Sequence, residues 1–149
     1  MSHEERNTVA GLIAGILVNA WVILKLRRMF ADGRLGGDDA VQVWAQAMLW
    51  VIPVGIALVI VVTILFNIAH AIATNEPKPS FVVDERDHAI SGFGMKVTMI
   101  ITSVGIIGMI VALAMGVATL TALIAMWFAF ALGSFIGDAA KVVRYRRGY

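Results

Sequence analysis

Histidine is the residue type in this sequence best suited to bind a metal ion or haem, because imidazole is a common ligand. The chain has three histidines, His3, His70 and His88, and no cysteine. His70 and His88 each stand alone near an expected helix end, with no second histidine one turn away. This spacing does not form a ligand set. We therefore predict no metal site and no cofactor, and His70 and His88 are the two candidates should a cofactor bind.

A larger set of polar residues is expected at one end of the molecule, and we call it the polar inner cluster. Such a set could bind an ion, an anionic lipid headgroup or a protein partner. The alternative, which we favour, is that it caps helices and is solvated at a membrane surface. Its members are Asn67, His70, Asp84, Glu85, Arg86, Asp87, His88, Lys96 and Asp138.

Lys96 and Asp138 bound a stretch from Val97 to Gly137 that contains no charged residue. If the chain turns back midway, at a hairpin over Gly116–Thr119, position 96 lies opposite about position 139. A desolvated charge needs a partner. We therefore predict an ion pair between Lys96 and Asp138 near the inner membrane surface.

Residue patterns typical of catalysis are missing from the sequence. There is no nucleophile motif, phosphate-binding loop or paired acid–base constellation. No ionisable residue lies deep in an apolar segment, where proton-coupled transport normally requires one, and Asn19 is the deepest strongly polar residue. Basic residues cluster at segment ends instead of forming a stripe, which argues against nucleic-acid binding. We expect a protein that is not an enzyme.

The elements that position these residues are expected to be membrane-spanning helices. Hydrophobic residues make up 60% of the 149 residues and charged residues 15%, against about 25% charged in soluble domains. Such a chain is stable where the bilayer is the apolar solvent. We predict one all-α domain over residues 1–149, an integral membrane bundle of four transmembrane helices. Their expected ranges are about 8–28, 40–73, 84–115 and 119–142.

Helix ends and bends are also indicated by residue type. Asp39, with Gln42 three residues on, predicts a capping box for the second helix. Asp84 predicts an N-cap for the third, with acidic residues near the positive helix end. Pro53 lacks a backbone donor and is the expected bend within the long second helix.

Small residues at four-residue spacing predict where helices pack closely, because they let two backbones approach. Whether these faces serve the bundle interior or a homodimer stays open, and we favour the interior. They are Gly11, Gly15 and Asn19 on the first helix, Gly108 and Ala112 on the third, and Ala125, Ala129, Gly133 and Gly137 on the fourth. Asn19 is expected to form a hydrogen bond across such a contact.

The distribution of basic residues predicts that both termini lie on the cytoplasmic side of the cell membrane. Four spans place eight basic residues on the side of the termini and four on the other side. Trp21, Trp44 and Trp50 fall toward the expected outer interface, and Tyr145 and Tyr149 toward the inner one. Aromatic rings at these levels are typical membrane anchors.

The segment Asp84-Glu85-Arg86-Asp87, followed by Ile90, resembles the Asp-Glu-Arg-Asp-x-x-Ile signature of a group of small prokaryotic four-helix membrane proteins. In that group the signature opens a helix after a polar loop. The group is a domain of unknown function, so the resemblance implies a small protein of the bacterial inner membrane and no specific activity.

These patterns leave three functional hypotheses. The first is a non-enzymatic accessory, assembly or regulatory protein that acts by helix–helix interaction in a homo-oligomer or a larger membrane complex. The second is a small oligomeric transporter or channel, which requires a cavity around Asn19, Asn67 or His70. The third is a haem- or quinone-binding redox subunit, which requires His70 and His88 to converge or to face a pocket.

Overall fold

The computed structural model describes residues 3–74 and 84–148, and within these ranges every regular element is an α-helix. The all-α prediction is thereby confirmed. Among the described residues, four helical segments are long and apolar enough to cross a membrane when α2 and α3 are taken as one. The helices are α1 (His3–Ala31), α2 (Ala40–Leu49), α3 (Val51–Thr74), α4 (Glu85–Ala114) and α5 (Thr119–Arg147).

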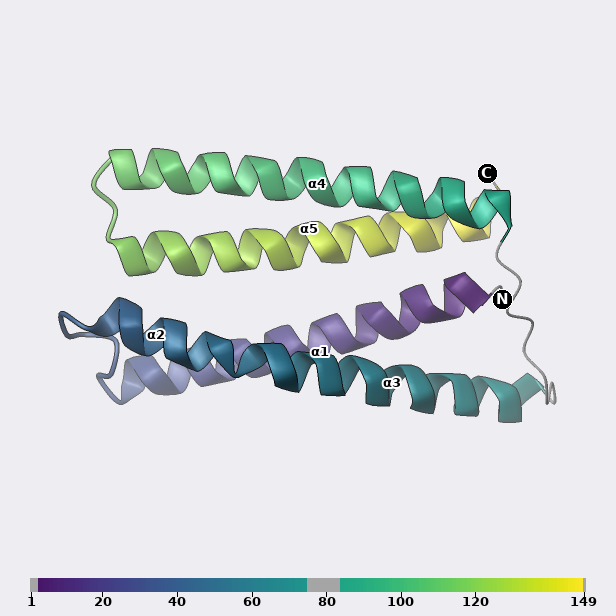
Figure 1. Ribbon diagram of the computed structural model, residues 1–149, viewed down its shortest axis with the longest axis horizontal. Coiled ribbons are helices and arrows are strands. Elements are labelled where there is room, and N and C mark those ends of the chain that lie inside the picture. The colour runs from purple at the N-terminus through teal and green to yellow at the C-terminus, as the bar shows by residue number, and fades with distance from the viewer. Residues whose placement is uncertain (1–2, 75–83, 149) are drawn as a thin grey trace.

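The first and last helices, α1 and α5, extend beyond their predicted ranges at the end of the molecule where the termini lie (Figure 1). α1 begins at His3 instead of about residue 8, and α5 continues to Arg147 instead of 142. Glu4 and Glu5 occupy the first turn of α1, and three arginines occupy the last turn of α5. Each charge lies at the helix end whose dipole it complements, which stabilises these polar extensions.

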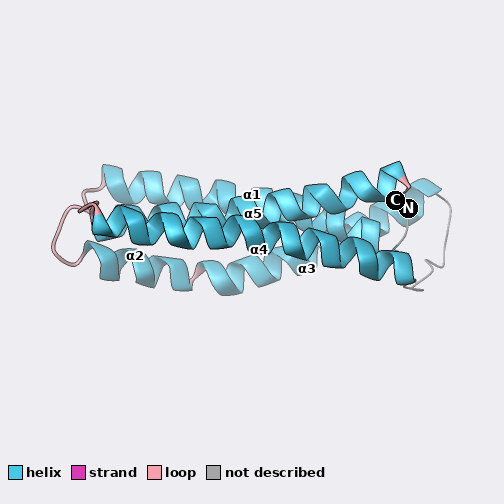
Figure 2. Cartoon of the chain, turned by 90° about the horizontal axis from the view of Figure 1, so that it is seen from above, coloured by secondary structure: helices cyan, strands magenta, loops and turns pink. Residues whose placement is uncertain are grey.

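The helices run side by side along one axis (Figure 1). α4 and α5 form a closely packed antiparallel hairpin, and α1 packs against both α3 and α5. The two termini, the end of α3 and the start of α4 lie at one end of the molecule, as four alternating spans require (Figure 1). Figure 2 shows the same arrangement from a perpendicular direction, with the hairpin between α4 and α5 at the opposite end.

The predicted second helix is interrupted at Trp50, which separates α2 from α3. Pro53 has no N–H to donate to the Leu49 carbonyl, and its ring crowds that carbonyl. The interruption therefore lies one turn before the proline that causes it. Trp50 itself keeps helical angles, with φ −72° and ψ −20°.

The two predicted N-caps have different outcomes. Asp84 forms the expected cap of α4: its Oδ1 accepts from the Asp87 amide at 2.7 Å, and the Asp84 amide donates to Asp87 Oδ2 at 3.3 Å. The capping box predicted for Asp39 and Gln42 is wrong, because the Asp39 side chain makes no cap hydrogen bond. Only the Asp39 backbone carbonyl takes part, accepting from the Val43 amide at 2.9 Å.

A buried apolar cluster holds α1, α2 and the start of α3 together at the end opposite the termini. Against it pack half-buried side chains from the first half of α5, including Trp127. Trp44 is a core residue, only 8% exposed, so its assignment as a membrane anchor is wrong; Trp50 is 68% exposed. The cluster consists of Val22, Leu26, Met29, Leu35, Trp44, Met48 and Val51.

Most of the molecule's apolar surface faces outward. In the most apolar stretch of α4 no residue is buried, and in that of α2–α3 only 6% are. Ile100, Ile107 and Leu65, for example, are at least 60% exposed. Exposed apolar surface on this scale is unfavourable in water, and it suits helices surrounded by lipid.

Candidate functional site

The closest helix contact is between α4 and α5, and glycine makes it possible. A Cβ atom added at Gly133 would lie 2.9 Å from Thr102 Cγ2 and 3.2 Å from the Thr98 carbonyl oxygen. One added at Gly137 would lie 2.8 Å from the Gly94 carbonyl oxygen. The Thr98 hydroxyl donates to the Gly133 carbonyl at 3.1 Å. Backbones this close need a missing side chain, and Gly133 and Gly137 provide it on the α5 side of the contact.

The remaining small residues predicted on this hairpin behave differently. Ala129 does lie in the contact, opposite Gly105. Gly108 is exposed, and a Cβ there would meet no atom within 4 Å. Ala125 is exposed and Ala112 only half-buried. Gly108 and Ala125 therefore do not lie in the α4–α5 contact, and the contacting face of α4 runs through Gly94, Thr98 and Gly105 instead.

On α1 the predicted small-residue face does not mediate close packing either. A Cβ atom added at Gly11 or Gly15 would meet nothing within 4 Å. Ala10 and Ala14, each 0% exposed, form the packed face instead. The two faces are one residue apart, about 100° around the helix. Small residues at four-residue spacing occur on both, so the sequence pattern did not distinguish them.

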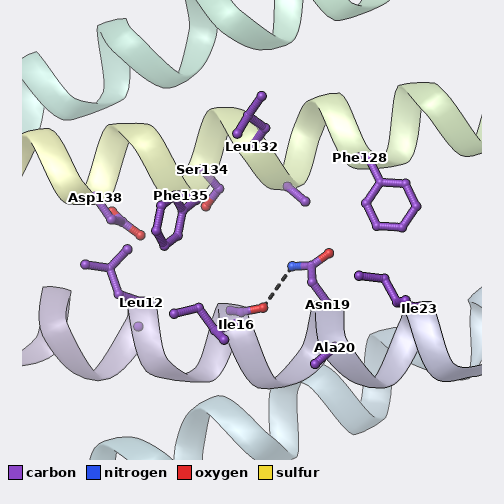
Figure 3. Close-up of a pocket in the computed structure, with 13 residues that line it drawn as sticks. Leu12, Ile16, Asn19, Ala20, Ile23, Phe128, Leu132, Ser134, Phe135 and Asp138 are labelled. Carbon is purple, nitrogen blue, oxygen red and sulfur yellow. Dashed lines mark hydrogen bonds between the residues drawn. The ribbon is translucent and has the colours of Figure 1, made fainter.

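Gly11 and Gly15 instead border an open groove of about 530 Å³ between α1 and α5, which we call the α1–α5 groove (Figure 3). Its surface is mostly apolar, and its polar side chains are Asn19, Ser134 and Asp138. Other residues that line it are Leu12, Ile16, Ala20, Ile23, Phe128, Ala131, Leu132 and Phe135.

Asn19, the deepest strongly polar residue, is only partly satisfied. Its Nδ2 donates to the Gly15 carbonyl one turn earlier at 2.8 Å, as the dashed line in Figure 3 shows. Its Oδ1 is buried and accepts no hydrogen bond. In Figure 3 the amide extends from α1 toward α5. Asn19 therefore does not form the cross-helix bond that was predicted for it.

Asp138 pairs within its own helix, and the predicted ion pair with Lys96 is wrong. Lys141 Nζ lies 2.8 Å from Asp138 Oδ1, with both side chains less than one-third exposed. Lys96 is exposed. A partner one turn away on the same helix is reached at little conformational cost, and the Lys141 side chain also lies over Gly94, on the facing helix.

The polar inner cluster is divided in the structure. Asp87 is buried at 5% exposure and accepts a hydrogen bond from the Tyr145 hydroxyl. Arg86 Nη2 donates to the Tyr145 carbonyl at 3.3 Å. Arg144 stacks on Phe93, with its guanidinium carbon 3.7 Å from the ring centroid. The signature segment of α4 is thus joined to the end of α5.

Arg6 of α1 is a functional candidate that the sequence pattern did not indicate. Its side chain is 4% exposed, and its Nε has no hydrogen-bond partner. Arg6 Nη2 lies 3.4 Å from His3 Nδ1. The burial of Arg6 is apparent only in the folded chain, because an arginine that precedes an apolar segment is ordinarily expected to be solvated at the membrane surface.

The other members of the polar inner cluster take part in no common site. Asn67 donates to the Thr63 carbonyl at 2.8 Å, within its own helix. His70 is half-buried, whereas Glu85 and His88 are exposed. Neither histidine lines the α1–α5 groove. Within residues 3–74 and 84–148, no group of three or more histidine and carboxylate side chains is arranged to hold a metal ion.

Comparison with known proteins found no matching family model, no matching curated protein and no matching solved structure. The resemblance carried by residues 84–90 therefore stays a prediction. What the structure adds is a local role for that segment, since Asp84 caps α4, Asp87 contacts Tyr145, and Arg86 holds the end of α5.

Proposed function

We propose that this chain is a non-enzymatic membrane protein that crosses the bilayer four times and binds a transmembrane helix in its α1–α5 groove. It would serve as an accessory, assembly or regulatory subunit. The partner helix comes from a second copy or from another protein of a larger complex. The observation that carries the proposal is the face of Gly11 and Gly15 in this groove, where an added Cβ atom would meet no atom of a neighbouring helix within 4 Å.

A transmembrane helix suits this groove for a physical reason. Lipid tails are as apolar as leucine, so helices associate in a membrane through close van der Waals contact rather than through hydrophobic burial. Glycine faces allow that contact. Ile16 and Leu132, 53% exposed each, flank the groove with apolar surface. A partner helix would lie between them with its backbone against Gly11 and Gly15.

The test is a bulky side chain in the groove. A Cβ atom added at Gly15 meets no atom of another element within 4 Å, so the leucine of Gly15→Leu would extend into the groove. It should block the partner and leave the fold intact. The matched control is Gly108→Leu, which also points into open space but lies on α4. The measurement is the intact mass of the complex extracted in mild detergent and recorded by native mass spectrometry.

We expect the wild-type complex to exceed the mass of one chain by the mass of a second protein chain. The Gly15→Leu variant should lack this additional mass, and the Gly108→Leu control should keep it. A wild-type mass of one chain, also after transfer into lipid nanodiscs, would contradict the proposal. An excess consisting only of lipid would show that the groove holds acyl chains and not a helix.

The transporter hypothesis has one observation in its favour, since Asn19 and Asp138 line the same groove. Asn67 and His70, its other candidate residues, do not. Proton or cation flux through liposomes containing the protein would support it if Asp138→Asn abolished that flux. We rank it second, because the groove surface is mainly apolar and Asp138 is paired with Lys141.

A further inference from the structure

We propose that the end of the α4–α5 hairpin binds the anionic phosphate headgroups of membrane lipids through four arginines. We call this group, Arg86, Arg144, Arg146 and Arg147, the arginine end. This inference needs the hairpin to cross a bilayer but does not depend on a partner in the α1–α5 groove. The two proposals can therefore fail separately.

Tertiary contacts bring the arginine end together. Arg86 belongs to the first turn of α4, and its hydrogen bond to the Tyr145 carbonyl spans 59 positions of sequence. Arg144 is held on the Phe93 ring by a cation–π contact. One guanidinium group from each helix is thus held against the facing helix of the α4–α5 hairpin. Arg146 and Arg147 extend the positive charge along the last turn of α5.

These arginines have no carboxylate partner within the described part of the chain. The ion pair of Asp138 is formed with Lys141 and not with an arginine. Among the acidic residues at the start of α4, Asp84 caps the helix and Asp87 accepts a hydrogen bond from the Tyr145 hydroxyl, whereas Glu85 is exposed beside Arg86. Arg86, Arg146 and Arg147 are exposed. Their charge is therefore available to an anion from outside the chain.

The position of the arginine end fits the headgroup layer. The charge-free stretch of α5 ends at Gly137, and Arg144 lies about two helical turns further, roughly 10 Å along the axis. The headgroup layer on each side of a bilayer is roughly 5–8 Å thick. A long arginine side chain can bend back toward it. Arg144 and its neighbours thus lie at and just outside that layer.

Arginine is also the appropriate side chain for a phosphodiester. Its planar guanidinium presents a fork of N–H donors that matches two phosphate oxygens, whereas lysine is a point charge. Clusters of basic residues at the end of a membrane helix are attracted to anionic lipid surfaces. The same chemistry would accept free phosphate, so the experiment must separate the two sources.

The test titrates phosphatidylglycerol into the purified full chain in nanodiscs of phosphatidylcholine and reads bound lipid by native mass spectrometry. The double variant Arg86→Gln/Arg144→Gln should bind phosphatidylglycerol roughly thirtyfold more weakly, the factor expected for two basic residues at a membrane surface. Arg27→Gln/Arg28→Gln, with the same charge change at the opposite end, is the matched control and should retain binding. Unchanged binding in the first variant overturns the proposal.

Two further measurements do not depend on that variant folding. Glu85→Gln removes an exposed negative charge next to Arg86, so phosphatidylglycerol should bind the variant more tightly; equal or weaker binding argues against the site. In the wild type, binding should weaken as salt rises, since exposed charges are screened. Displacement of the lipid by millimolar inorganic phosphate would overturn the lipid assignment in favour of free phosphate.

Discussion

At the scale of single residues, Asn19 and Asp138 show how little a polar side chain in an apolar segment reveals about its partner. Both were expected to bond across helices, and both bond within their own. A local acceptor or donor one turn away is always within reach in a helix. A cross-helix partner depends on rotation and spacing that only packing determines.

The Oδ1 atom of Asn19 is buried and accepts no hydrogen bond, which leads to a prediction about thermal stability. A buried acceptor without a hydrogen bond costs about 1–3 kcal/mol, and an apolar side chain of similar shape avoids that cost. Asn19→Leu should therefore raise the thermal unfolding midpoint in detergent. Asn19→Asp should lower it, because the same position would then bury a charge. A midpoint that falls with leucine would mean that the amide stabilises the bundle.

The ion pair of Asp138 is tested by a double-mutant cycle. Asp138→Ala should destabilise the wild type more than it destabilises a Lys141→Ala background, with a coupling of about 0.3–1 kcal/mol for a partly exposed pair. Against Lys96→Ala the effects should add. Chemical denaturation in detergent supplies the free energies. A coupling found with Lys96 and missing with Lys141 would show that Lys96 is the partner of Asp138.

At the scale of helices, the α4–α5 hairpin and the α1–α5 groove use small residues in opposite ways. In the hairpin, glycine removes side chains so that two backbones approach. In the groove, glycine leaves space that the chain does not fill. Small residues at four-residue spacing thus occur both where two helices are packed together and where a groove is left between them.

Gly133→Leu tests the closed contact. The new Cβ would lie 2.9 Å from Thr102 Cγ2, so the hairpin must separate, at a cost of about 1–3 kcal/mol or more. The thermal unfolding midpoint should fall well below that of Gly108→Leu, whose side chain points into open space. Equal midpoints for the two variants would show that α4 and α5 are not packed as described.

At the scale of the whole molecule, the termini and the start of α4 lie at one end and the loop between α1 and α2 at the other (Figure 1). The basic residues favour the first end for the cytoplasm. The chain has no native cysteine, so single introduced cysteines report their side of the membrane without background.

Glu85→Cys and Asp38→Cys, both at exposed positions, test this orientation. In intact cells a membrane-impermeant maleimide should label Asp38→Cys only, and Glu85→Cys should react after the cells are opened. The reverse pattern would establish the opposite orientation. Labelling of both positions in intact cells would contradict four membrane crossings.

Several features followed from the sequence alone because they depend on neighbouring residues. The all-α class follows from apolar runs long enough to span a bilayer. The cap at Asp84 and the turn at Gly116, whose φ is 81°, follow from local side-chain and backbone preferences. The interruption near Pro53 follows from its missing donor. The cap, the turn and the interruption are each decided within one or two helical turns, and each apolar run within one continuous segment of sequence.

Tertiary structure alone decided which faces meet. Ala10 and Ala14, not Gly11 and Gly15, form the packed face of α1, because helix rotation follows from the sum of many contacts. Arg86 reaches Tyr145 only because the hairpin returns the end of α5 to the start of α4. Rotation and long-range register are set by how all the helices pack together. The groove and the arginine end therefore became visible only in the folded chain.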